Sequence, residues 1–234
     1  MFARVASGYD RLNRILSLGL DVAWRRRALR ELGRCVPENP THLDVLDLAT
    51  GTADFAIAAV RHFPRARATG VDLTPEMLEI ADRKVKAAGL SGMIELHQGD
   101  AAKLAFPDGT FDVALCAFGF RNFPDRAMSL SELARILKYG GRLVVLEFFR
   151  PRSVLMGGLT ACWLKAATAF FARANADDYA YLRRSIEKTC SAETFKAEAE
   201  MAGFETERCR FFIPACTCLV LRKYGKMQTC SNNR

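Results

Sequence analysis

Short apolar runs alternate with amphipathic segments through much of the chain, and this alternation restricts the fold more than any other feature. The apolar runs have the length of buried strands and lie at residues 45–48, 68–71, 94–97, 111–116 and 143–148. Strands that alternate with helices of about 10–15 residues imply right-handed crossovers between parallel neighbours. The pattern therefore predicts an α/β fold with a doubly wound, mostly parallel sheet.

The segments between these runs have the spacing of helices, expected at 55–63, 75–88, 126–137 and 192–202. Thr74-Pro75-Glu76 predicts a helix start, with a hydroxyl cap, a proline in the first position and an acid near the positive end. Gly140-Gly141 predicts a turn before the fifth strand. Two further strands, at 204–213 and 216–222, are expected to form an antiparallel hairpin that completes a seven-stranded sheet.

The length of 234 residues suits a single domain over residues 1–234 with two appendages. Residues 1–35 are basic and helical in pattern and are expected to form an N-terminal flap. Residues 151–187 interrupt the strand–helix alternation and predict an apolar helical lid.

Three aspartates, Asp47, Asp72 and Asp100, come at or just after the ends of the first three predicted strands. Ligands of open parallel sheets bind beyond the carboxyl ends of the strands. Asp72 lies about 20 residues after the turn that contains Gly51, where an acid can accept hydrogen bonds from ribose hydroxyls. The three acids predict a nucleoside site, with Asp47 expected to support the turn more than to contact the ligand.

The turn after the first strand argues against a pyrophosphate ligand. A dinucleotide fingerprint needs several glycines, and only Gly51 is present; an ATP-binding loop needs Gly-Lys-Ser/Thr, which is absent. S-adenosylmethionine is a nucleoside without phosphates and is the expected cofactor. Asp100 is expected to accept a hydrogen bond from the adenine amino group, and Phe106 and Leu73 to enclose the purine.

The net charge of +8 permits nucleic acid, an anionic membrane surface or acidic small molecules as partners. Arg25-Arg26-Arg27 is expected to favour peripheral binding to an anionic membrane. The most apolar stretch, 154–172, contains Lys165 and is not expected to span a bilayer. Met1–Asp10 does not read as a signal peptide, so a cytoplasmic protein with reduced cysteines and no metal site is expected.

Four segments resemble the ubiquinone/menaquinone biosynthesis C-methyltransferases, a branch of the class I S-adenosylmethionine-dependent enzymes. They are Tyr9–Asn13 with Ser17 and Trp24, Val45–Asp54, Ala105–Asn122, and Arg135–Phe148. The resemblance implies that Tyr9, Gly51, Thr52, Asp72, Asp100 and Ala101 contact the cofactor. The chain departs from the family pattern at Ala53, where glycine is frequent, at Ala117, where serine is common, and at Tyr139, where proline is usual.

Carbon methylation of a polyprenylated quinol needs a phenolate, whose charge activates the ortho carbon, and a carbon–methyl–sulfur alignment. Arg121 follows the fourth strand and is the expected phenolate-stabilising residue. Asn122 is expected to orient the same oxygen or a water. Asp54, Asp125 and a water all remain candidates for the proton acceptor.

Demethylmenaquinol is favoured as the acceptor, and a 2-methoxy-6-polyprenyl-1,4-benzoquinol of ubiquinone biosynthesis is the alternative. An RNA methyltransferase would suit the charge, but Phe118-Gly119-Phe120-Arg121 replaces the Asn/Asp-Pro-Pro-aromatic motif of many base-amine enzymes. No nucleic-acid partner is therefore expected. A non-catalytic cofactor-binding protein is disfavoured by Thr52, Asp72 and Arg121, and a homodimer is left open.

Overall fold

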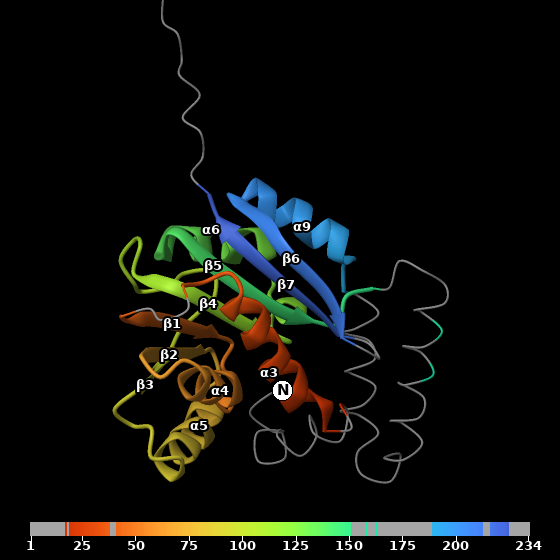
Figure 1. The fold of residues 1–234 in the computed structure, drawn as a ribbon. Coiled ribbons are helices and arrows are strands. Elements are labelled where there is room, and N and C mark those ends of the chain that lie inside the picture. Colours follow the sequence, from red (N-terminus) through yellow and green to blue (C-terminus); the bar gives the residue numbers. More distant parts are fainter. Residues whose placement is uncertain are drawn as a thin grey trace, which may run out of the picture.

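The computed structural model describes residues 17, 19–37, 41–150, 158, 162, 189–212 and 216–224 of the chain. Seven strands in this part form one sheet in the order β3-β2-β1-β4-β5-β7-β6 (Figure 1). Their bounds are β1 Leu43–Leu48, β2 Ala66–Asp72, β3 Ile94–Gln98, β4 Phe111–Ala117, β5 Leu137–Glu147, β6 Phe204–Phe212 and β7 Cys216–Lys223. Strands β1 to β5 are parallel, whereas β7 is antiparallel to both β5 and β6. The predicted doubly wound sheet with an antiparallel C-terminal hairpin is confirmed.

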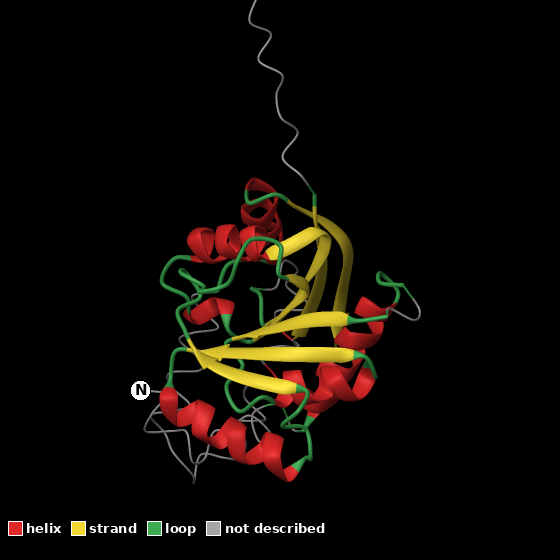
Figure 2. Ribbon diagram, turned by 90° about the vertical axis from the view of Figure 1, so that its left-hand side faces the viewer, coloured by secondary structure: helices red, strands yellow, loops and turns green. Residues whose placement is uncertain are grey.

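Helices cover both faces of the sheet (Figure 2). On one face lie α3 Leu20–Gly33, α4 Asp54–His62 and α5 Pro75–Ala87; on the other lie α6 Arg126–Ile136 and α9 Ala192–Met201. Each layer buries its own apolar cluster against the strands. The two covered faces explain why β1 and β4 are buried along most of their length, because side chains on both sides of these strands are covered.

Two details of the predicted elements are wrong. Gly140 and Gly141 lie inside β5, where the pairing with β4 shifts register between Phe111 and Val113. Gly140 has φ +74°, and a Cβ on Gly141 would lie 2.9 Å from the Asp112 carbonyl oxygen, so the pair forms an irregularity within the strand. Helix α5 begins at Pro75 as expected, but the Thr74 hydroxyl makes no capping bond.

Several expectations fall on residues outside the described part. Tyr9 and the first half of the flap, the apolar stretch 154–172 and almost all of the predicted lid at 151–187 are among them. Within the described residues, no helix combines the length and apolar character needed to cross a bilayer.

Candidate active site

A pocket opens beyond the carboxyl ends of β1, β2 and β4. The strand order reverses between β1 and β4, which is where open α/β sheets bind their ligands. The lining comes from the turn after β1, the end of β2, and the segments after β3 and β4. It consists of Leu48, Ala49, Gly51, Val71, Asp72, Leu73, Thr74, Met77, Gly99, Asp100, Ala101, Ala117, Phe118, Gly119, Asn122, Phe123 and Pro124.

The turn after β1 is tightly coiled. Ala49, Gly51 and Ala53 have φ values of +55°, +57° and +64°, a conformation that favours glycine. Close approach of the next loop is possible because Gly119 lacks a side chain: a Cβ there would lie 2.9 Å from the Ala49 Cβ and 2.8 Å from the Cys116 Sγ. The small residues therefore bring the turn and the loop after β4 together around the pocket.

Asp47 supports this turn from beneath, as expected. Its carboxylate is buried, and Oδ2 accepts hydrogen bonds from the Thr50 hydroxyl at 2.7 Å and from the Ala56 N–H at 2.9 Å. Burial raises the pKa of Asp47 to about 6, although these two donors and the charge of Arg25 act in the opposite direction. Asp47 does not line the pocket.

Asp72 joins the turn to the end of β2. Its Oδ2 accepts from the Gly51 N–H at 2.8 Å, and its Oδ1 accepts from the Thr74 N–H at 3.0 Å. An ionised carboxylate has about four lone-pair positions, so Asp72 can accept further bonds from a ligand. Since Asp72 lines the pocket, these positions suit the two hydroxyls of a ribose.

Asp100 and Ala101 also line the pocket. The Asp100 side chain is exposed, and its Oδ1 accepts from the Ala102 N–H at 2.9 Å. Leu73 also lines the pocket and is 65% exposed, which leaves apolar surface available to a purine. The expectation for Phe106 is not met: this ring packs edge-on against His97 and Phe111 and is not part of the lining.

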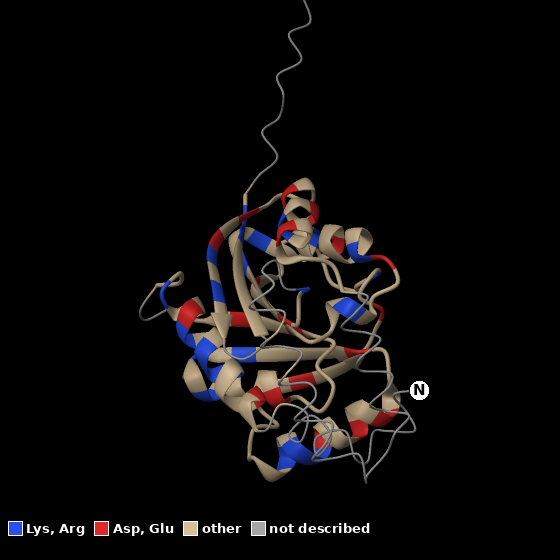
Figure 3. Cartoon of the chain, turned by 90° about the vertical axis from the view of Figure 1, so that its right-hand side faces the viewer, with Lys and Arg blue, Asp and Glu red and all other residues tan. Residues whose placement is uncertain are grey.

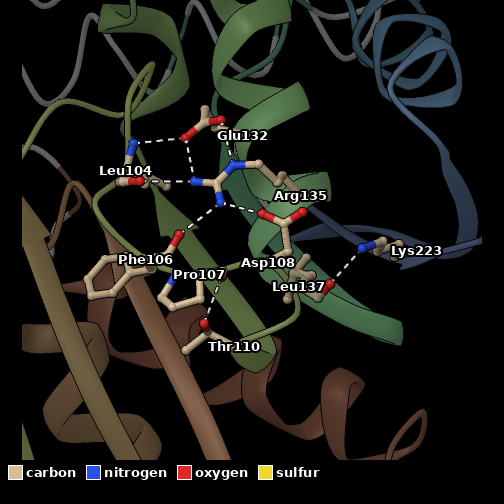
Figure 4. A network of polar contacts seen from close by, with 9 residues as sticks. All are labelled: Leu104, Phe106, Pro107, Asp108, Thr110, Glu132, Arg135, Leu137 and Lys223. Atoms are coloured by element: carbon tan, nitrogen blue, oxygen red, sulfur yellow. Dashed lines mark hydrogen bonds and ion pairs between the residues drawn. The ribbon is translucent and has the colours of Figure 1, made fainter.

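Arg135 of α6 holds the segment that carries Asp100 (Figure 4). Its guanidinium donates to the carbonyl oxygens of Leu104 and Phe106 at 2.9 and 2.8 Å, and to the carboxylates of Glu132 and Asp108. Glu132 in turn accepts from the Leu104 N–H at 2.9 Å. Arg135 thus connects the backbone of the segment after β3 to helix α6, which follows β4 in the chain.

The electrostatics of the pocket select against phosphates. Two carboxylates, Asp72 and Asp100, line it, and the described lining contains no lysine or arginine. A pyrophosphate would therefore meet negative charge without compensation, whereas a nucleoside with a positively charged sulfonium would not.

Thr52 and Arg121 lie beside the pocket and not in its described lining. The Thr52 hydroxyl is buried and accepts from Lys84 Nζ at 2.9 Å. Arg121, in the short 3-10 helix Phe120–Asn122, donates to Glu147 Oε1 at 2.7 Å. Its side chain is 9% exposed, so it belongs to the interior and not to a surface loop.

Glu147 is a site residue that the sequence analysis did not single out. It is fully buried at the carboxyl end of β5, and it also accepts from the N–H groups of Arg121 and Phe148. Like the three aspartates it is an acid at the end of an apolar strand, and this placement is the signal that would have identified it.

Aromatic rings surround the Arg121–Glu147 pair. The Phe118 and Phe148 rings stack with centroids 4.8 Å apart, and Trp24 of α3 packs edge-on against Phe148. The Arg121 guanidinium lies 5.7 Å from the Phe118 ring centre and 5.9 Å from that of Phe148. Phe118 therefore contacts the Arg121 guanidinium and also lines the pocket.

The other predicted polar residues have identifiable partners. Asn122 lines the pocket and donates to the Phe118 carbonyl oxygen at 3.3 Å. Asp125 caps α6 by accepting from the Met128 N–H, and Asp54 pairs with Lys84 at 2.6 Å. Both carboxylates offered as proton acceptors thus have structural roles. Ala117 also lines the pocket, and its side chain has no hydroxyl to offer a ligand.

Comparison with known proteins gives a consistent match. The model of the ubiE/COQ5 methyltransferase family matches residues 1–218. Demethylmenaquinone methyltransferase of Deinococcus radiodurans is 41% identical over 209 residues, covering 88% of this chain and 84% of that protein. The enzyme of the same name from Thermus thermophilus is 42% identical over 207 residues, covering 87% and 91%. The ubiquinone/menaquinone biosynthesis C-methyltransferase UbiE of Geobacter sp. is 38% identical over 213 residues, covering 89% and 88%.

Solved structures with lower identity share the fold. A SAM-dependent methyltransferase from Aquifex aeolicus matches with a TM-score of 0.62 at 18% identity, over 83% of this chain and 88% of that one. The [4+2]-cyclase SpnF matches with a TM-score of 0.63 at 18% identity, over 86% and 81%. One of these proteins is a methyltransferase and the other a cyclase, so the structural similarity supports the fold and not a particular activity.

Proposed function

Because the chain belongs to the ubiE/COQ5 methyltransferase family, we propose that it transfers a methyl group from S-adenosylmethionine to a ring carbon of demethylmenaquinol. The observation that carries this proposal is the 41–42% identity to two demethylmenaquinone methyltransferases over most of both chains. Ubiquinone/menaquinone enzymes are also similar, at 38% in the Geobacter protein, so the benzoquinol is the second candidate acceptor.

The described lining fits the cofactor. Asp72 can bind the ribose hydroxyls, Asp100 can accept from the adenine amino group, and Leu73 offers apolar contact to the purine. The backbone of Gly51 and Ala101 completes the lining on either side. When bound, S-adenosylmethionine supplies an electrophilic methyl group on a positively charged sulfur.

Arg121 is proposed to stabilise the phenolate of the acceptor. Once the phenolic proton has left, the oxygen's charge increases electron density at the ortho carbon. That carbon would take up the methyl group as the methyl–sulfur bond breaks, with the neutral thioether as the leaving group. Loss of the ring proton from that carbon restores the aromatic quinol. A guanidinium held in place before the reaction stabilises such developing charge without reorganisation, an effect of roughly 10²–10³ in rate for a single donor. Asn122, one residue further on and in the lining, is proposed to orient the same oxygen.

The test is methyl transfer from labelled S-adenosylmethionine to demethylmenaquinol, followed as label in the extracted lipid. Arg121→Ala should lower turnover by at least roughly 10²-fold while cofactor affinity is kept. Arg126→Ala is the matched control, because Arg126 pairs with Glu198 between α6 and α9 and is not part of the pocket lining. Normal turnover by Arg121→Ala would remove this residue from the mechanism.

Removing Arg121 alone leaves Glu147 as an unpaired buried acid, which can unfold the protein. The double variant Arg121→Gln/Glu147→Gln removes both charges together and keeps side chains of similar size. It should fold, bind the cofactor and fail to methylate. Label found in added RNA and not in the lipid would instead favour the nucleic-acid alternative.

The enzyme is further proposed to work at a membrane surface, because a polyprenylated acceptor resides in the bilayer. The three arginines expected to serve this purpose are not equivalent in the fold. Arg25 is buried and pairs with Asp21 at 2.8 Å, and the Arg27 guanidinium lies 6.0 Å from the Phe212 ring centre. Arg26 is exposed and makes no such contact within the described residues.

A further inference from the structure

A second concavity of about 550 Å³ lies between α3 and α4, and we call it the α3–α4 groove. One stripe of each helix forms it, since its residues recur three to four positions apart on both. Leu29 and Ile57 are among the apolar residues of its floor. Its basic residues are Arg25, Arg26, Arg30, Arg61 and His62. The groove thus has an aliphatic floor and a positively charged edge.

Three arginines of the groove have no carboxylate partner among the described residues. Arg26, Arg30 and Arg61 are exposed, and none has a carboxylate of the described residues within 4.0 Å. Their neighbours on α3 differ in this respect, since Arg25 pairs with Asp21 and Arg34 with Glu31. Asp54 also lines the groove, but Lys84 lies 2.6 Å from its carboxylate.

His62 also lines the groove, together with these arginines. Its pKa is lowered by burial and by the charge of Arg30. In Figure 3, blue segments that mark Lys and Arg gather on the ribbon at the left of the view, with red Asp and Glu segments beside them. An anion in the groove would therefore meet guanidinium groups that have no other partner within the described structure.

The aliphatic floor and the positively charged edge together favour some classes of anionic ligand over others. A free phosphate would use the guanidinium groups but not the aliphatic floor. A single-stranded nucleic acid would stack its bases on aromatic rings, and the described lining of the groove has no Phe, Tyr or Trp. An amphiphile with a phosphate headgroup and acyl chains uses both parts of the groove.

We propose that the α3–α4 groove is a docking site for the phosphate headgroups of anionic membrane lipids. Its position relative to the active site gives this docking a purpose. Arg25 lines one end of the groove, and its guanidinium lies 5.7 Å from the centre of the Phe118 ring, which is also part of the wall of the cofactor pocket. A bilayer held at the groove therefore lies beside the site where a membrane-embedded acceptor would react. Lipid binding by the groove does not depend on the proposed function; only the reaction of a membrane-embedded acceptor beside it does.

The test uses the full-length protein and flotation with two kinds of vesicle. One contains phosphatidylcholine alone, and the other contains phosphatidylcholine with phosphatidylglycerol, both at low salt. The variant Arg30→Gln/Arg61→Gln removes two charges from the groove. The control Arg83→Gln/Lys196→Gln removes two charges from α5 and α9, and neither control residue forms an ion pair within the described structure.

The wild type and the control should bind the anionic vesicles and not the neutral ones. The groove variant should bind them roughly 30-fold more weakly, the effect of losing two arginines near a charged surface. Turnover with a short-tailed, water-soluble quinol should be unchanged in this variant. Failure of methyl transfer in all proteins, with vesicle binding intact, would contradict the proposed function and leave the groove assignment standing.

Four results would overturn the assignment. They are no vesicle binding by the wild type, equal weakening in the groove and control variants, stabilisation by inorganic phosphate without vesicle binding, and preferential binding of an RNA oligonucleotide. The second would mean that net charge alone matters. The third and fourth would assign the groove to a soluble anion or to nucleic acid.

Discussion

At the scale of single residues, Asp47 shows how a buried acid can build a site without touching the ligand. Its two hydrogen bonds fix the turn after β1, and burial keeps its pKa near 6. The folded state thus favours the protonated carboxyl more than the unfolded state does, since an unfolded aspartate has a pKa of about 3.8. Asp47 consequently adds stability below about pH 4 that is lost as the pH rises through about 6.

The variant Asp47→Asn should remove this pH dependence, because its amide oxygen can accept the same two bonds without titrating. The free energy of unfolding of the wild type, relative to the variant, should fall by up to about 3 kcal/mol between about pH 4 and pH 7. Urea unfolding at several pH values measures this difference. Thr50→Val removes a bond that lowers the pKa of Asp47 and should enlarge the fall; a pH-independent difference would refute the assignment.

Sequence reasoning at this scale located acids but not their partners. The positions of Asp47, Asp72 and Asp100 follow from strand ends, which periodicity marks well. The pairing of Arg121 with Glu147 joins residues that lie far apart in the chain, and only the parallel alignment of β4 with β5 brings them together. For the same reason the bond from Lys84 of α5 to the Thr52 hydroxyl could not be foreseen.

At the scale of elements, the segment after β3 has little regular structure of its own and depends on α6. Arg135 holds two of its carbonyl oxygens and one of its carboxylates, and Glu132 holds an N–H of the same segment. This explains how Asp100, an exposed residue, is positioned at the pocket. The interactions resemble a clamp from a rigid helix onto a loop.

Arg135→Lys should therefore destabilise the protein, because one ammonium group cannot reach the carbonyl oxygens and carboxylates that a planar guanidinium serves. We expect a loss of about 1–3 kcal/mol in the free energy of unfolding, measured with urea. Cofactor affinity should also fall, since Asp100 and Ala101 lie on the released segment. Arg83→Lys on the exposed surface of α5 is the control and should change neither quantity.

Elements themselves were predicted well where their periodicity is strong. The parallel strands and α4, α5, α6 and α9 lie within a few residues of their expected bounds, except that β5 begins at Leu137, six residues before the expected start at 143. Gly140-Gly141 was misread because glycine pairs are typical of turns, whereas here they accommodate a shift in register inside β5. Phe106 was misplaced because its ring turns toward His97 and Phe111, a choice made by packing and not by local sequence.

At the scale of the whole molecule, the cofactor pocket exists only in the assembled sheet. Its walls come from segments after β1, β2, β3 and β4, so S-adenosylmethionine should bind the folded state alone. At roughly 100 times its dissociation constant the cofactor should add about 2.7 kcal/mol, which raises Tm by about 5–11 °C for a chain of this size. Thermal unfolding with and without S-adenosylmethionine measures this.

The control for that experiment is Asp72→Ala. Loss of a charge-assisted bond to ribose should weaken affinity about 10- to 100-fold, so the same cofactor concentration should give a clearly smaller rise in Tm. S-adenosylhomocysteine should stabilise the wild type as well, because Asp72 and Asp100 would contact the nucleoside. An equal rise in both proteins would show that Asp72 does not bind the cofactor.

The place of β7 in the sheet has a consequence for synthesis on the ribosome. β7 is made after β6 yet lies between β6 and β5, whose residues Leu143–Leu146 are fully buried. A nascent chain that has emerged only as far as β6 lacks the strand that joins β6 to the rest of the sheet, and β5 presents an unpaired apolar edge. Such chains would be recognised by chaperones or proteases. Once residues 216–223 have been translated, the aggregation-prone intermediate can complete its sheet.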